Sequence, residues 1–138
     1  MKIPNIRTRN FTLSEIMHRD KEITQEKIYS GLVRMGYMQG FSDFLYYKYG
    51  RHIRLKITSG NRELTYNRSI GSSDRSHHVY RIDDNYVICA NDLVSPDLKL
   101  EKLYKDFADF SRGETYMHKR FKFVHNSLHG KNEQWIQG

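Results

Sequence analysis

The chain has 138 residues, about the size of one compact domain, so we expect a single domain over residues 1–138. Hydrophobic residues make up 38% of the chain and aromatic residues 13%, which is enough for a core and excludes a disordered protein. The net charge of +7 favours polyanionic partners, and the single cysteine, Cys89, excludes an intramolecular disulfide and any multi-cysteine zinc site.

The chain contains no stretch of about 18 consecutive apolar residues, so we expect no membrane-spanning helix and no membrane partner. Residues 1–10 are basic, but they lack the apolar region of a secretory signal. We therefore expect a protein that reaches other compartments through cell lysis or through assembly into a larger particle.

The first predicted elements are helical. Residues 12–15, TLSE, have the Thr-x-x-Glu form of a capping box, in which a hydroxyl and a carboxylate accept hydrogen bonds from N–H groups at a helix start. Apolar residues at helical spacing then occupy residues 28–35 and 41–45. Because Gly36 and Gly40 interrupt the pattern, it predicts two helical segments packed on a core.

The middle of the chain is predicted to form β-strands on either side of a long loop. Apolar and basic residues alternate over 53–57, which predicts a half-buried strand. Residues 59–77 are polar and predict an ordered loop with room for a short helix. His78–Ile82 and Tyr86–Ala90 are β-prone, and the turn-forming residues Asp83–Asn85 between them predict a hairpin.

The last third of the chain predicts a helix and a strand. Ser95–Pro96 supplies a helix start, and the apolar residues behind it, up to residue 110, have 3-4-3 spacing. Phe121–Asn126 alternates and predicts a strand, whereas the polar tail 131–138 is expected to be loosely ordered, outside a core of about residues 11–130. This order of elements predicts an α+β fold with a small antiparallel sheet packed on helices.

Three polar residues at the ends of predicted strands, His78, Asp92 and His125, form a candidate metal site. A three-residue hairpin turn would place His78 directly opposite Asp92, with Cβ atoms about 5 Å apart, whereas a two-residue turn would put them on opposite faces. A neighbouring strand that carries His125 would complete a His/Asp/His set. Such a set suits a zinc ion that keeps a fourth position open for water.

Residues 57–78, ITSGNRELTYNRSIGSSDRSHH, resemble the signature of M15-type zinc peptidases, the group of D-Ala-D-Ala carboxypeptidases and phage endolysins. That signature runs close to I-T-S-G-Y-R-S-x-x-Y-N-R-x-x-G-G-x-x-x-S-x-H. The opening FTLSEI at 11–16 resembles the family's opening, and FVHNSLHG at 123–130 resembles the segment with its last histidine ligand. The resemblance spans about residues 11–130 and implies the M15 fold.

The resemblance also implies a role for individual residues. His78 corresponds to the first zinc ligand of the family motif Ser-x-His-x-x-Gly-x-Ala-x-Asp, Asp92 to the second, and His125 to the third. Arg62 corresponds to the arginine that pairs with substrate carboxylate or carbonyl groups. The alternative is that Arg62 forms a salt bridge that holds the loop. Ser76 would support the site.

The chain departs from the family pattern between the first two ligands. Asp92 follows His78 by fourteen residues instead of the family's seven, which implies an inserted hairpin whose base keeps the two ligands adjacent. Asp84, at the hairpin tip, and His77, beside His78, are alternative ligands. The Ala-x-Asp context favours Asp92, and the Ser-x-His register favours His78.

The second departure concerns the general base. Many family members carry an acid three residues before the final histidine, where this chain has Lys122, and often another acid two residues after it, where this chain has Ser127. Glu114 and His118, from the preceding loop, are the candidate catalytic residues in their place. Lys122 and Ser127 favour the alternative that catalysis has been lost.

We therefore expect a zinc-dependent peptidase, encoded by a phage, that cleaves peptidoglycan stem peptides as a D,D-carboxypeptidase or an endopeptidase. The positive charge fits an anionic cell wall, which the protein would reach from a phage particle or after host lysis. The alternative is a catalytically degenerate virion component of the same fold, bound to other virion proteins through the inserted hairpin. A nucleic-acid binder rests on charge alone, so we expect no specific nucleic-acid partner.

Overall fold

The computed structural model describes residues 1–18, 20–128 and 131–138, so that positions 129 and 130 of the family-like segment 123–130 lie outside the described residues. The helices are α1 Leu13–Met17, α2 Gln25–Tyr49, α3 Leu64–Ser69 and α4 Leu100–Phe110. The strands are β1 Lys56–Ser59, β2 Arg81–Asp83, β3 Tyr86–Ile88, β4 Asn91–Val94, β5 Glu114–His118, β6 Phe123–Ser127 and β7 Gln134–Gln137.

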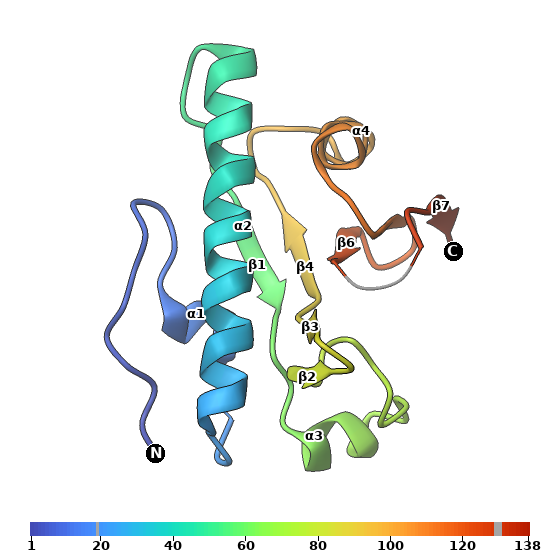
Figure 1. Ribbon diagram of the computed structural model, residues 1–138. Coiled ribbons are helices and arrows are strands. Elements are labelled where there is room, and N and C mark those ends of the chain that lie inside the picture. The colour runs from blue at the N-terminus through green and yellow to red at the C-terminus, as the bar shows by residue number, and fades with distance from the viewer. Residues whose placement is uncertain (19, 129–130) are drawn as a thin grey trace.

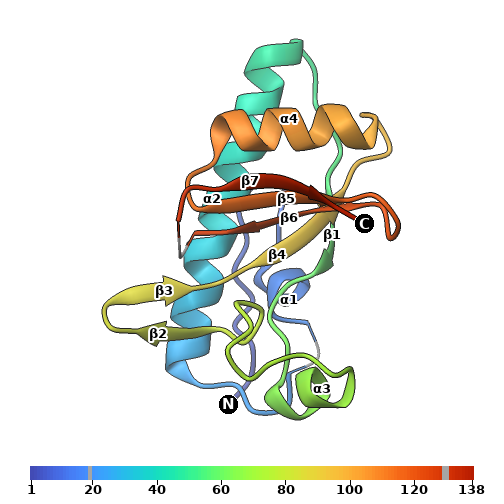
Figure 2. The same ribbon diagram turned by 90° about the vertical axis from the view of Figure 1, so that its right-hand side faces the viewer.

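Five strands form one sheet in the order β1-β4-β6-β5-β7, and β2 pairs with β3 in a separate hairpin. Neighbouring strands from β1 to β5 are antiparallel, whereas β7 runs parallel to β5. The long helix α2 lies along one face of the sheet, and α4 packs beside β5 and β6 (Figures 1 and 2). The α+β prediction is therefore confirmed, and β7 makes the sheet mixed instead of wholly antiparallel.

The capping box at residues 12–15 is present as predicted. The Thr12 hydroxyl accepts from the Glu15 N–H at 3.2 Å, and the Glu15 carboxylate accepts from the Thr12 N–H at 2.7 Å. These two bonds satisfy backbone donors that the first helical turn leaves unpaired. The short helix α1 begins here and buries three apolar side chains, Leu13, Ile16 and Met17, under α2.

The prediction of two helical segments is wrong, because α2 is continuous over 25 residues. An interior glycine costs about 1 kcal/mol relative to alanine, and packing on both sides of α2 outweighs that cost. Gly40 has a packing role, since a Cβ there would lie 3.3 Å from the ring of Phe110 on α4. Despite its length, α2 is not apolar enough to cross a membrane, and neither is any other helix of the described part of the chain.

The hairpin is confirmed, and of the two turn lengths left open by the sequence, the shorter one is present. Asp83 pairs with Tyr86, so the turn has two residues, Asp84 and Asn85, both with positive φ angles of 46° and 69°. Short polar side chains of this kind tolerate that backbone region and fit a tight primed turn. The ladder ends at Arg81, so the hairpin gives His78 and Asp92 neither the direct opposition of a three-residue turn nor the opposite faces of a two-residue turn.

Several other boundaries differ from the sequence prediction. The strand expected over 53–57 runs from Lys56 to Ser59. The helix expected from Ser95–Pro96 begins only after Lys99. The Ser95 hydroxyl accepts a hydrogen bond from the Asp97 N–H and donates one to the Arg54 carbonyl group, so this segment forms a turn. The tail expected to be loose contains the strand β7, which is held by pairing with β5. Neither β5 nor β7 is predicted from the sequence.

Candidate metal centre

One row of directly paired residues crosses the whole five-stranded sheet. Ser59 on β1 pairs with Asp92 on β4, Asp92 with His125 on β6, His125 with Tyr116 on β5, and Tyr116 with Trp135 on β7. Paired residues of neighbouring strands point to the same face, so these five side chains stand side by side. Two of the predicted metal ligands therefore come from adjacent positions of this row.

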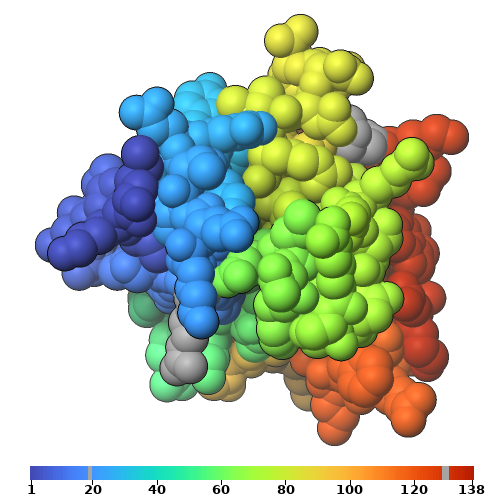
Figure 3. Space-filling model, turned by 90° about the horizontal axis from the view of Figure 1, so that it is seen from below, coloured from blue at the N-terminus to red at the C-terminus, as the bar shows by residue number. Residues whose placement is uncertain are grey.

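The third predicted ligand, His78, reaches the row from the loop that precedes the hairpin. Its backbone N–H donates to the Ser76 hydroxyl at 3.2 Å, and its carbonyl group accepts from the Arg62 N–H at 2.7 Å. The loop with α3 and the hairpin are neighbours on the face seen in Figure 3. Because the hairpin projects outward between His78 and Asp92, it lengthens the chain without separating the two side chains.

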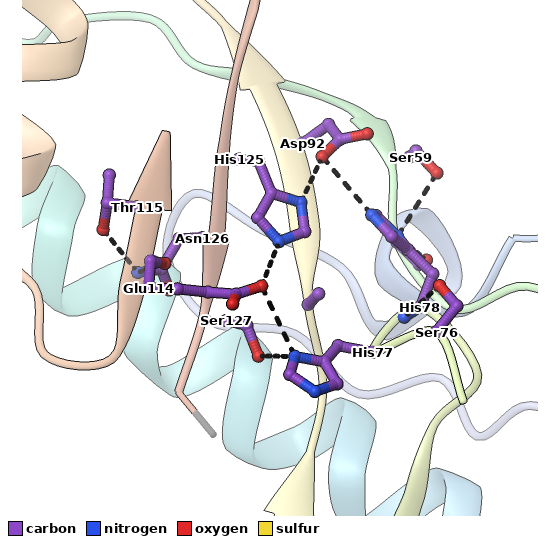
Figure 4. A network of polar contacts seen from close by, with 12 residues as sticks. Ser59, Ser76, His77, His78, Asp92, Glu114, Thr115, His125, Asn126 and Ser127 are labelled. Carbon is purple, nitrogen blue, oxygen red and sulfur yellow. Dashed lines mark hydrogen bonds and ion pairs between the residues drawn. The ribbon is translucent and has the colours of Figure 1, made fainter. Parts of the chain in front are cut away.

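The side chains of His78, Asp92 and His125 converge, as Figure 4 shows. One ligand atom from each residue lies within 4.8 Å of the other two, and all three residues are buried. Asp92 Oδ1 is the common neighbour, 2.8 Å from His125 Nδ1 and 3.3 Å from His78 Nε2. The group contains His78 and not His77, and Asp84 is far along the hairpin at its exposed tip.

The hydrogen bonds of His78 show that this group fits a metal ion. His78 Nδ1 lies 2.8 Å from the carbonyl oxygen of Gly60, which can only accept, so Nδ1 carries the proton. Burial lowers the pKa of His78, which favours the neutral ring with a lone pair on Nε2. That lone pair lies next to the Asp92 carboxylate, and a cation between them removes the repulsion between two acceptors.

His125 lies between two carboxylates. Its Nδ1 faces Asp92 and its Nε2 lies 3.1 Å from Glu114 Oε1. Burial by itself would lower the pKa of His125, but the hydrogen bonds to Asp92 and Glu114 outweigh it and raise the pKa. With the Nε2 proton donated to Glu114, Nδ1 is free to bind a metal, which is the usual way in which an outer carboxylate orients a ligand histidine.

The two carboxyl groups are ionised. Burial would raise the pKa of Asp92, but the adjacent imidazole groups of His125 and His78 outweigh burial and hold the pKa well below its ordinary value. Hydrogen bonds from His125 and His77 lower the pKa of Glu114 to about 2. A carboxylate and two imidazoles are ligands that transition metals accept, so the donor set suits such an ion.

The ligands line a cavity of about 430 Å³ that is also lined by Arg62, Ser76, His77, Glu114, Tyr116 and Phe123. Arg62 is held by the Ser59 hydroxyl at 3.2 Å and the Asn67 side-chain oxygen at 3.4 Å, and its Nη2 lies 3.9 Å from Asp92 Oδ2. These contacts hold the loop and also place the positively charged guanidinium group of Arg62 beside His78, Asp92 and His125. Ser76 acts on the backbone of His78.

Of the two candidate catalytic residues, the structure brings only Glu114 to the cavity. His118 lies at the other end of β5, where its ring packs on Phe121 and Phe123. Lys122 sits in the exposed β5–β6 turn with a φ of 56°, and Ser127 instead binds His77 Nδ1 at 2.7 Å.

Tyr116 and Trp135 are neighbours of the site that the sequence analysis did not single out. In β5, Thr115 and Met117 are buried and alternate with Glu114, Tyr116 and His118, but this two-residue pattern of burial is fixed by the pairing with β6 and is not a pattern of residue types in the sequence.

Comparison with known proteins agrees with this arrangement. A sequence model described as Peptidase M15 matches residues 9–127. The chain belongs to the peptidase M15 family. No curated protein and no solved structure matches the chain. Peptidases of this family are metallopeptidases, and the His78, Asp92 and His125 group of this M15 chain could bind a metal ion.

Proposed function

We propose that this M15 chain is a zinc-dependent peptidase that hydrolyses peptidoglycan stem peptides, as a D,D-carboxypeptidase or an endopeptidase. The observation that carries the proposal is the convergence of His78, Asp92 and His125 in one cavity with Arg62 at its side. The net charge of +7 supports attraction to an anionic cell wall. The resemblance to phage endolysins supports a phage-encoded protein that meets the wall from a particle or after lysis.

Zinc is the ion proposed because two imidazoles and one carboxylate leave one position of a tetrahedral site open. His78 Nε2, an Asp92 carboxylate oxygen and His125 Nδ1 would hold it. When bound, zinc supplies Lewis-acid chemistry toward a carbonyl group and a water molecule.

Arg62 would bind the substrate. Its guanidinium group lines the ligand cavity and also a neighbouring cavity of about 590 Å³, which His18, Tyr66 and Ile70 help to line. A planar guanidinium fits a carboxylate or a carbonyl group of a peptide. Its contacts with Ser59 and Asn67 would keep it in place before substrate arrives.

Glu114 is the candidate for proton transfer. Hydrolysis of an amide needs a group that takes a proton from water and returns it to the departing amine. Asp92 and Glu114 are the carboxylates that line the ligand cavity, and Asp92 is already a proposed ligand. Glu114 Oε1 lies 3.1 Å from His125 Nε2 and 3.5 Å from His77 Nδ1, so the second carboxylate oxygen would take part in proton transfer.

One observation favours the alternative function. Lys122 stands where many M15 peptidases carry an acid, and it lies in the β5–β6 turn, beyond the end of the ladder that contains His125. A chain without an effective base could remain as a binding module that recognises peptidoglycan or other virion proteins. The two functions differ in turnover and not in fold.

The test combines metal content with digestion. Elemental mass spectrometry of the purified protein should find about one zinc ion per chain, and His78→Ala and His125→Ala should remove it. Incubation with a stem pentapeptide and with cross-linked peptidoglycan should release D-alanine or free the cross-links, respectively. Zinc without any turnover would favour the binding module, and absence of metal from wild type would overturn the proposal.

A further inference from the structure

A column of stacked rings leads from His125 to the C-terminal strand. The rings of His125 and Tyr116 have centroids 4.5 Å apart and planes inclined by 17°. Tyr116 and Trp135 have centroids 4.9 Å apart and planes inclined by 27°. The rings therefore follow the cross-strand row from β6 through β5 to β7, and each stacks on the next.

The outer ring of the column belongs to a segment outside the family match, which ends at residue 127. β7 is nonetheless tied to the fold by backbone bonds from the Thr115 N–H to Glu133 and from the Lys119 N–H to Gln137. The Gln134 side-chain amide also donates to the Ala108 carbonyl group at 3.0 Å. The indole of Trp135 is thus presented by a paired strand and not by a loose tail.

The stacked rings restrain the face of the His125 imidazole, whereas its hydrogen bonds restrain only the edge of the ring. Asp92 and Glu114 hold the two ring nitrogens, so they fix the edge of the imidazole. Its face is covered by Tyr116, and Tyr116 is in turn covered by Trp135. A ligand ring that is fixed at its edge and on its face needs little reorganisation when it binds a metal ion.

We propose that Trp135 is a positioning residue of the metal centre and that β7, although outside the matched family region, is part of this site. Trp135 acts through Tyr116 on the ring plane of His125 and touches neither the metal ion nor the substrate. The inference rests on the proposed role of His125 as a ligand. It does not depend on whether the chain cleaves any peptide.

The first test compares Trp135→Ala with Trp135→Phe and Ile136→Ala in the full chain, with Co²⁺ as the probe. Ile136 is the matched control, because it lies next to Trp135 on the opposite face of β7 and is 53% exposed. Trp135→Ala should weaken Co²⁺ binding about tenfold, the lower end of what loss of outer support costs a metal site. Trp135→Phe should restore most of the affinity, and Ile136→Ala should keep the wild-type value.

The visible spectrum of the Co²⁺-saturated protein separates positioning from general destabilisation. At saturation, loss of positioning should change the d–d bands of Trp135→Ala, whereas mere loss of stability would leave them as in wild type. Equal affinities and equal spectra for wild type and Trp135→Ala would overturn the inference. So would an equal loss in Trp135→Ala and Ile136→Ala.

The second test uses wild-type protein, because Trp135 is the only tryptophan of the chain. Cu²⁺ and Co²⁺ quench a nearby indole, so either ion should reduce the tryptophan fluorescence in proportion to occupancy, and His125→Ala should abolish that response. Binding without quenching would overturn the inference while leaving the metal site intact. Absence of binding to wild type would instead defeat the proposed function.

Discussion

Asn91 and Asn126 face each other across β4 and β6, and their side chains have opposite hydrogen-bonding states. Asn126 Oδ1 accepts from the buried guanidinium group of Arg34 at 2.8 Å, and its Nδ2 donates to Thr115 Oγ1 at 3.0 Å. Within residues 1–18, 20–128 and 131–138, neither side-chain polar atom of Asn91 has a partner. The Asn126 side chain therefore ties α2 to the sheet next to His125, a proposed ligand, whereas the Asn91 side chain makes no such link.

This difference predicts unequal costs for the same substitution. Asn126→Ala leaves a buried cation with one partner fewer and should lower the free energy of unfolding by about 2–3 kcal/mol. Asn91→Ala removes an amide that makes no hydrogen bond and should change it by less than about 1 kcal/mol. Urea unfolding of the metal-free proteins measures both. Equal losses would contradict the assigned bonding of the pair.

A glycine pair tests the packing of α1 against β1. A Cβ on Gly60 would lie 2.2 Å from the Ile16 carbonyl oxygen, whereas a Cβ on Gly36 would meet nothing within 4 Å. Gly60→Ala should therefore cost about 3 kcal/mol and disturb the carbonyl group that holds His78. Gly36→Ala should stabilise α2 by about 0.5–1 kcal/mol. Thermal melts decide, and an unchanged melting temperature for Gly60→Ala would refute the close contact.

Asp106 gives the fold a defined sensitivity to acid. It is buried and accepts hydrogen bonds from Lys48 and Tyr49, which outweigh the effect of burial and lower its pKa from 3.8. A carboxyl group with a lowered pKa stabilises the fold above its ordinary pKa and loses that contribution as pH falls.

Asp106→Asn should therefore cost about 2 kcal/mol at neutral pH, and its deficit should shrink as the pH falls below 3.8. Unfolding free energies of both proteins across pH 7 to 3 provide the measurement. A deficit that stays constant over this range would show that the charge of Asp106 does not matter.

Two substitutions separate the structural and chemical roles of Glu114. Glu114→Gln keeps an oxygen for the His125 Nε2 proton but cannot take up a proton, so metal affinity should hold while peptide turnover falls about 10²–10⁴-fold. Glu114→Ala also removes the support of His125 and should weaken metal binding about 10–100-fold. Chelator competition and a peptide-release assay measure the two effects. If Glu114→Gln turned over peptide at the wild-type rate, Glu114 would not be the group that transfers the proton.

Arg62 is predicted to act on substrate and not on metal. Arg62→Ala should retain wild-type metal content and lower kcat/KM for a stem peptide about 10–100-fold, the value of a hydrogen bond to a charged group. Arg68→Ala is the matched control, since Arg68 lies in the same motif but pairs with Asp74 on the surface. An equal rate for wild type and Arg62→Ala would exclude Arg62 from substrate binding.

Much of the fold follows from short-range patterns in the sequence. The capping box predicts the start of α1 because Thr12 and Glu15 are three residues apart and need no distant partner. The 3-4-3 spacing behind Leu100 predicts α4 because a helix presents such residues on one face. The motif over 57–78 likewise identifies the family, because its residues lie in one continuous segment.

Tertiary structure alone decides the pairing of strands that lie far apart in the chain. The sequence names His78, Asp92 and His125 as candidates, but it places Glu114 in a loop, because the strand β5 is defined by its pairing with β6. The parallel contact of β7, which makes Trp135 a neighbour of Tyr116, depends on a sheet edge that exists only after folding. Local propensity acts over a few residues, whereas strand register is set by which distant segments bury their apolar faces together.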